Sequence, residues 1–252
     1  MALMGEVLKT VGILIGTGFG AALIILFIYH LLQFNKQMHM LLDECDPVKF
    51  STHYRKKLTS QKLTQKGRNI FICYLCLGLY YCGEYDEMQQ WIQEASVHSK
   101  HTGLGKIMLL QHQLSLHLVE KEYDLAQQRL EQMEELIASE RQLKLYKLLK
   151  DDIEYNRFLI SLALRNASNA EETLVARLAQ AKCMLSRVLI KGALAEVYIS
   201  NGQTEKAIDA LKYVVQHGNR LHVVSLAKQQ LWELGEPVVI AKSFLEGYTC
   251  NG

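Results

Sequence analysis

Proline is scarce in this chain, with two among 252 residues. Runs in which valine or threonine alternate with polar residues, the pattern of a half-buried strand, are lacking as well. Proline interrupts helices and alternation marks strands, so both features favour helix over strand. Long stretches of Leu, Gln, Glu, Lys and Ala, which are good helix formers, point the same way. The sequence therefore predicts an all-α protein.

Motifs that carry enzymatic chemistry are lacking too. The chain has no Gly-x-Ser-x-Gly, no His-Glu-x-x-His and no phosphate loop following a strand. Cys73 and Cys76 have the spacing of metal ligands, but no second such pair completes a set of four. His112 and His117 are interpreted as surface or interhelical residues. We therefore predict a non-enzymatic protein with no catalytic residue, no metal and no cofactor.

A strong net charge is also missing, since the formal value is +2. This is too small to make nucleic acid the main partner. The charge is uneven, however, because residues 35–68 contain eight Lys or Arg against three Asp or Glu. This basic segment directly follows an apolar stretch.

The cysteines show no spacing typical of a disulfide framework and are scattered among apolar positions. Free, buried thiols in a reducing compartment are the expected state. The six are Cys45, Cys73, Cys76, Cys82, Cys183 and Cys250.

One long hydrophobic run is present, at residues 11–34 after a short flank at 1–10. Its only side chain that ionises near neutrality is His30. Twenty-four helical residues span a hydrocarbon core of about 30 Å with room to tilt. The run is longer than the apolar region of a cleaved signal and lacks a small-residue cleavage site. We expect a single transmembrane helix that anchors the protein in the lipid bilayer.

The flanks of this span predict its orientation. Lys36 and Lys49 follow it closely, and basic residues tend to stay inside the cell, which places the larger domain in the cytoplasm at the cell membrane. Gly12, Gly16 and Gly20 share one helix face, where a second span could approach closely. A homodimer, or a structural role in a membrane complex, is therefore an alternative. The other alternative is an extracytoplasmic, N-anchored assembly or secretion accessory protein.

Residues 35–68 are interpreted as a basic, helical juxtamembrane connector. Asp46 followed by Pro47 is typical of a helix start, because aspartate caps helices and proline fits their first position. The run Arg55, Lys56, Lys57 can contact anionic lipid or simply form a solvated helix face.

The most regular stretch lies between Arg187 and Leu231. Small and large residues recur at helical spacing on both sides of Asn201-Gly202, which predicts two antiparallel helices. Gly202 suits the left-handed end of the first helix, and Thr204 is expected to cap the second. The residues of the pattern are Leu194, Ala195, Tyr198, Gly202, Ala207, Leu211 and Val214.

This order resembles the tetratricopeptide repeat, with its small residue in helix A, its turn glycine about eight positions later and its helix-B alanine five beyond that. Lys191 stands where the family favours a large aromatic, and Asn219 where it favours a closing proline. Weaker copies cover residues 69–97, with the turn at Gly83, and 104–136, where Lys121 replaces the turn glycine. A further unit pairs a helix at 139–165 with one at 170–185. The resemblance implies a superhelix of about three to four hairpins over residues 69–231. A tail at 232–252 is expected to form a short capping element and a disordered end.

The resemblance also implies a function. Stacked hairpins form an inner face that can hold a partner's peptide or helix. The family's inner-face positions correspond here to Tyr80, Tyr81, Gln111, Ser115 and Glu196. The leading hypothesis is a membrane-anchored scaffold that binds a protein partner at the cytoplasmic face, although these side chains could instead only fill gaps between helices.

Overall fold

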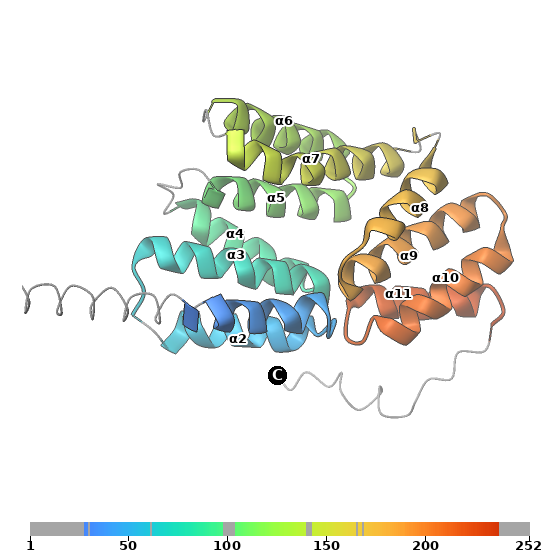
Figure 1. Cartoon of the computed structure of the whole chain (residues 1–252), viewed down its shortest axis with the longest axis horizontal. Helices are drawn as coiled ribbons and strands as arrows, with labels where there is room; N and C mark the ends of the chain where they lie inside the picture. The colour runs from blue at the N-terminus through green and yellow to red at the C-terminus, as the bar shows by residue number, and fades with distance from the viewer. Residues whose placement is uncertain are drawn as a thin grey trace, which may run out of the picture. The chain divides into compact units, whose positions relative to one another are not determined.

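The computed structural model (Figure 1) divides the chain into two compact units, Met1–Met40 and Leu41–Gly252. In the first unit, residues 28, 29 and 31–40 are helical. None of the helices in the described part of the chain combines the length and the apolarity that a membrane crossing requires. The predicted flank 1–10, most of the predicted span 11–34, and with it Gly12, Gly16 and Gly20, lie outside the described residues. Those that the structure describes are 28, 29, 31–60, 62–97, 104–139, 143–164, 166, 167 and 169–236.

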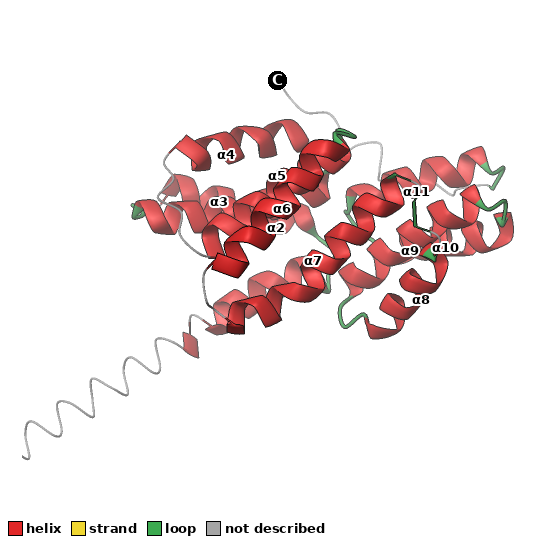
Figure 2. Cartoon of the chain, turned by 90° about the horizontal axis from the view of Figure 1, so that it is seen from above, coloured by secondary structure: helices red, strands yellow, loops and turns green. Residues whose placement is uncertain are grey.

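The second unit is built from helices, and its described residues include no strand (Figure 2). The prediction of an all-α protein is confirmed. The helices are α2 Pro47–Ser60, α3 Gln65–Cys82, α4 Tyr85–Val97, α5 Leu104–Val119, α6 Tyr123–Ser139, α7 Leu143–Ala163, α8 Ala170–Gln180, α9 Met184–Ser200, α10 Thr204–His217 and α11 His222–Glu233.

Neighbours along the chain pack against one another. Close backbone approach joins α2 to α3, α3 to α4, α4 to α5, α5 to α6, α6 to α7, α8 to α9, α9 to α10, and α10 to α11. In addition, α3 packs against α5 and α9 against α11, so helices two apart also meet. Sequential packing of this kind is consistent with an α-α repeat.

The turns after α3, α5 and α9 share one backbone conformation. Each turn contains one residue in the left-handed region, with φ of 80° at Gly83, 62° at Lys121 and 69° at Gly202. The left-handed position predicted for Gly202 is therefore confirmed. Lys121 adopts the same conformation although its side chain makes it unfavourable by about 1–2 kcal/mol, so the surrounding packing must hold it there.

Two local predictions are wrong. Thr204 is already the first residue of α10, and Gln203 precedes it as the capping residue without a side-chain cap bond, so Thr204 does not cap the helix. The predicted helix over 170–185 is interrupted, since α8 ends at Gln180 and α9 begins at Met184. The break lets α8 fold back on α9 and bury Leu174 against Leu194, which one straight helix cannot do.

α2 starts as the sequence predicts. The carboxylate of Asp46 accepts the backbone N–H of Lys49 at 2.9 Å, and Pro47 is the first helical residue. Phe50 and Tyr54 are almost fully buried where α2 packs on α3. Part of the predicted connector therefore belongs to the packed second unit.

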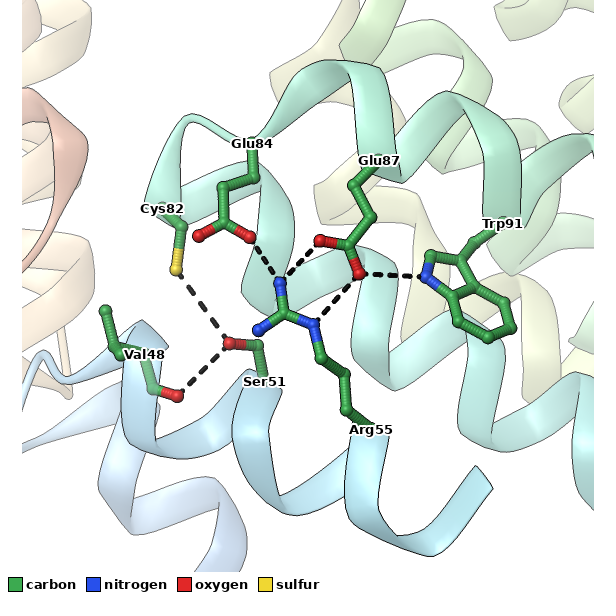
Figure 3. Close-up of polar contacts among 7 residues, drawn as sticks. All are labelled: Val48, Ser51, Arg55, Cys82, Glu84, Glu87 and Trp91. Carbon is green, nitrogen blue, oxygen red and sulfur yellow. Dashed lines mark hydrogen bonds and ion pairs between the residues drawn. The ribbon is translucent and has the colours of Figure 1, made fainter. Parts of the chain in front are cut away.

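A polar network joins α2 to the α3–α4 hairpin (Figure 3). Nε and Nη2 of Arg55 donate to the two carboxylate oxygens of Glu87 at 2.9 and 2.6 Å, and Nη2 also pairs with Glu84. Trp91 donates its indole N–H to Glu87 at 3.1 Å. The hydrogen bond from Arg55 is the main reason that the pKa of Glu87 is lowered. Arg55 thus has partners within the protein, and the ammonium of Lys57 lies 5.0 Å from the centroid of the Phe71 ring.

The beginning and the end of the second unit meet. Asn219 donates its side-chain amide to the carbonyl of Glu44 at 2.8 Å, and Arg220 donates its backbone N–H to Cys45 at 3.3 Å. Arg220 also pairs with Asp46 at 3.8 Å. Beside these contacts α11 packs against α3, so residues far apart in the sequence form one junction.

Candidate functional site

Two of the predicted inner-face residues lie in the last turn of α3. The rings of Tyr80 and Tyr81 are half-buried and contact edge to face, with centroids 5.1 Å apart. The chain adds Tyr85 at the start of α4, whose ring centroid lies 6.1 Å from that of Tyr80 and 6.0 Å from that of His222 on α11. Burial, more than any neighbouring group, raises the pKa of Tyr80 to about 12. The phenol therefore stays neutral at physiological pH and can both donate and accept hydrogen bonds.

α7 brings further groups to the same place. Electrostatic interactions connect Tyr81 with Tyr155 and Asp152 on α7 and with Cys183 before α9. Tyr155 is half-buried, and the guanidinium of Arg177 from α8 lies 4.5 Å from its ring centroid. We name Tyr80, Tyr81, Tyr85 and Tyr155 the tyrosine cluster. Its members come from α3, α4 and α7, and residues of α8 and α11 contact it.

Sequence reasoning missed half of this cluster. Tyr85 carried a signal, because it follows the turn glycine Gly83 by two residues at the start of a helix. Tyr155 gave none, since it is one of several large residues in an amphipathic helix. Its position beside Tyr81 results from packing between distant parts of the chain.

Two carboxylates are accessible to solvent although the surrounding protein partly desolvates them. Asp152 and Glu196 are exposed. Surrounding protein nevertheless displaces enough water to raise the pKa of each carboxyl group. At Asp152 the charge of Asp151 adds to this increase in pKa, and the charge of Arg177 opposes it. A carboxylate in such a position gains more from a cationic partner than one in bulk water.

The other two predicted residues lie on α5. The amide of Gln111 exchanges two hydrogen bonds with that of Asn156 on α7, at 3.1 and 2.6 Å. Asn156 is buried, so this pair satisfies polar groups that would otherwise be costly inside the unit. Ser115, one turn further along α5, is half-buried.

Replacing Asn156 by leucine should destabilise the protein by about 2 kcal/mol, because the partly buried amide of Gln111 would lose both of its hydrogen bonds to Asn156. Urea unfolding followed by circular dichroism measures the loss. The double variant Gln111→Met/Asn156→Leu removes both polar groups and should recover most of the stability. Equal stability of the single variant and the wild type would contradict a structural role of the amide pair.

One group of potential metal ligands occurs in the part of the chain that the structure describes. His117, Glu120 and Glu122 place their ligand atoms within 4.8 Å of one another at the α5–α6 turn. Glu120 follows His117 by three residues, a neighbour that the sequence interpretation overlooked. The ring of His117 is already hydrogen-bonded to Glu122 at 2.7 Å, and both glutamates are exposed, as in many surface pairs.

The two cysteines with metal-ligand spacing are packing residues. Cys73 and Cys76 are at most 1% exposed in the interior of α3. Burial raises the pKa of Cys73 to about 11 and raises that of Cys76 as well. Both thiols therefore remain protonated, whereas a metal ligand or a nucleophile must be a thiolate.

An open cleft of about 490 Å³ lies where α7 meets α8. Glu154, Arg157 and Asn169 contribute to its lining. Arg157 is paired with Glu134 of α6, so the only cation in this lining already has a partner within the protein. The cleft is an open surface feature that borders the tyrosine cluster, because Phe158 of its lining stacks on Tyr155 with ring centroids 6.3 Å apart.

No protein-family model, no curated protein and no solved structure matches this chain. The fold itself defines the class, which is an all-helical protein whose helices pack in sequence in the manner of an α-α repeat.

Proposed function

We propose that the protein is a membrane-anchored, non-enzymatic scaffold with a tetratricopeptide-like domain that binds a protein partner. The observation that carries the proposal is the tyrosine cluster, with Asp152 in electrostatic interaction with Tyr81. A second exposed, partly desolvated carboxylate, Glu196, is a separate predicted inner-face position on α9. The sequential helix packing and the recurrent turns at Gly83, Lys121 and Gly202 support the repeat architecture.

The chemistry of these groups favours one kind of ligand. Tyrosine rings offer a large contact area with a polar tip, at a small cost in side-chain entropy. Carboxylates whose ionised form is disfavoured by desolvation are stabilised by an incoming cation. The proposed ligand is therefore an extended peptide or a helix of the partner that carries lysine or arginine.

A comparison of four forms of the full-length protein tests the site. Glu196→Lys and Asp152→Lys reverse the charge at accessible positions, and Asp209→Lys makes the same change at an exposed position on α10. Proteins co-purified from detergent-solubilised membranes are quantified by mass spectrometry. We expect a partner that is recovered with the wild type and Asp209→Lys and is depleted at least about tenfold with the other two, a loss of about 1.4 kcal/mol. Equal recovery with all four forms would exclude the site.

The location proposed for this domain is the cytoplasmic side of the cell membrane, with residues 11–34 as the anchor. Cys250 in the tail provides a test, because burial raises the pKa of Cys45, Cys73, Cys76 and Cys82 and makes these thiols unreactive. In a Cys183→Ser background, an impermeant thiol reagent should label Cys250 only after the cells are lysed. Labelling in intact cells would place the domain outside and favour the extracytoplasmic alternative.

A further inference from the structure

Arg177, in the last turn of α8, differs from the other arginines in the described part of the chain. Each of the others binds a carboxylate, a carbonyl or a side-chain amide of the protein. Arg177 makes no hydrogen bond and no ion pair with the described residues. Its guanidinium lies over the ring of Tyr155 instead, with Cζ 4.5 Å from the ring centroid. The others are Arg55, Arg68, Arg129, Arg157, Arg187 and Arg220.

A carboxylate stands beside this aromatic contact. Asp152 precedes Tyr155 by three residues on α7, so the two side chains leave the same side of the helix. The charge of Arg177 acts on Asp152 and opposes the increase in its pKa, although the two groups form no ion pair. Asp152 also interacts electrostatically with Tyr81. An aromatic face and a carboxylate, the two groups that attract a cation in proteins, therefore occur together here.

The surroundings of the Tyr155 ring leave room for a ligand. Phe158 stacks beside this ring and also lines the open cleft between α7 and α8. Thr173 lines the cleft from α8 and lies one turn before Arg177, on the same side of that helix. The cleft therefore borders the ring that Arg177 covers, and its volume of about 490 Å³ can hold the main chain of a bound segment.

Arg177 can leave the ring without the movement of a helix. Its side chain is half-buried, and no hydrogen bond has to break when it rotates into solvent. The backbones of α7 and α8 are not among the sequential helix pairs that approach closely along their length. The contact between Arg177 and Tyr155 is thus one that a second cation can replace.

We propose that Tyr155 and Asp152 form a guanidinium-binding site, which Arg177 occupies in the free protein and an arginine of the partner occupies in the complex. One ring face and one carboxylate accommodate one cation, because two guanidinium groups at the same place repel each other. Arg177 therefore competes with the partner and lowers its affinity.

This inference rests on the proposed function and narrows the ligand from lysine or arginine to arginine. The planar guanidinium stacks on an aromatic ring and matches the geometry of a carboxylate, whereas the ammonium of lysine is a compact, strongly hydrated charge. The contact that Arg177 makes within the chain is an example of this recognition.

Fluorescence anisotropy of labelled peptides tests the competition. Full-length protein in an uncharged detergent is titrated into a pentapeptide of glycine and serine with one central arginine and a neutral fluorophore. A second peptide has lysine at the centre. The site is open only while Arg177 is away from it, and the apparent affinity is reduced by that open fraction. We expect Arg177→Ala to bind the arginine peptide at least about tenfold more tightly than the wild type does, and more tightly than it binds the lysine peptide.

Three further variants serve as controls. Arg187→Ala removes the same side chain from an exposed position on α9, where it donates to a backbone carbonyl, and should bind the peptides as the wild type does. Arg177→Gln removes the charge, keeps part of the side-chain stem and should show the same gain as Arg177→Ala. Asp152→Asn in the Arg177→Ala background should lose the gain. Circular dichroism checks that each variant is folded.

Equal affinity of the wild type and Arg177→Ala for the arginine peptide would overturn the inference, as would equal affinity of Arg177→Ala for the two peptides. Absence of binding to every form would overturn it as well. If the co-purified partner is nevertheless lost with Asp152→Lys, only the role given to Arg177 fails and the proposed function stands. If the partner is recovered equally with all forms, the proposed function itself fails.

Discussion

Gly83→Ala is expected to lower the free energy of unfolding by about 3 kcal/mol, because two penalties add at this position. Its φ of 80° is unfavourable for a residue with a side chain. A Cβ atom there would also lie 2.7 Å from Cγ and Nδ1 of His222. Cγ is the ring atom nearest the backbone, so the ring cannot escape without changing χ1 or moving α11. Chemical denaturation of the full-length protein measures the loss.

Gly202→Ala is the matched control for this prediction. Gly202 has a similar φ of 69°, but a Cβ atom there would meet nothing within 4 Å. Only the backbone penalty remains, so we expect a loss of about 1 kcal/mol. The difference between the two variants reports the contact between the α3–α4 turn and α11, and Gly83→Ala/His222→Ala should recover part of it. Equal losses for Gly83→Ala and Gly202→Ala would show that this contact does not form.

Acidification is expected to destabilise the protein through His112. This side chain is buried between α5 and α3, its ring is hydrogen-bonded to the backbone of Cys73, and its Nε2 finds no partner among the described residues. Burial lowers the pKa of His112 from 6.5 to about 4. Between these values the unfolded chain binds a proton that the folded protein does not, so stability decreases as the pH falls. The free energy of unfolding decreases by about 3 kcal/mol in total through His112. The decrease begins as the pH falls to about 6.5 and is complete once the pH is below about 4.

The difference between the wild type and His112→Leu isolates this effect. Other groups also titrate in this range: the pKa of the half-buried His53 is lowered by burial, and that of Glu87 is lowered by Arg55. These groups are present in both proteins, so their contributions cancel in the comparison. Urea unfolding at a series of pH values from 7.5 to about 4.5 should show a steeper decline for the wild type. Parallel profiles would mean that His112 has the same pKa in the folded and in the unfolded protein.

Part of the candidate site could be predicted from local pattern. Tyr80 and Tyr81 precede a recognisable turn glycine by three and two residues, and the family's inner-face positions place them together. Tyr85 follows the same turn, whereas Tyr155 and His222 join them only through packing between distant parts of the chain. His222 comes from a helix more than 130 residues away in the sequence. Whether two helices that are distant in the sequence meet depends on the small rotations that accumulate between successive helices. These rotations cannot be read from a local sequence pattern.

The sequence by itself determined the helical class, the stripes of buried residues and the turns at Gly83 and Gly202, because helical periodicity and the left-handed preference of glycine are properties of a few neighbouring residues. Only the tertiary structure decided where the helix over 170–185 breaks, that Lys121 adopts a left-handed conformation, and that α11 returns to α3. These outcomes depend on what each helix can bury against its neighbours, and this free energy outweighs the local preferences of the chain.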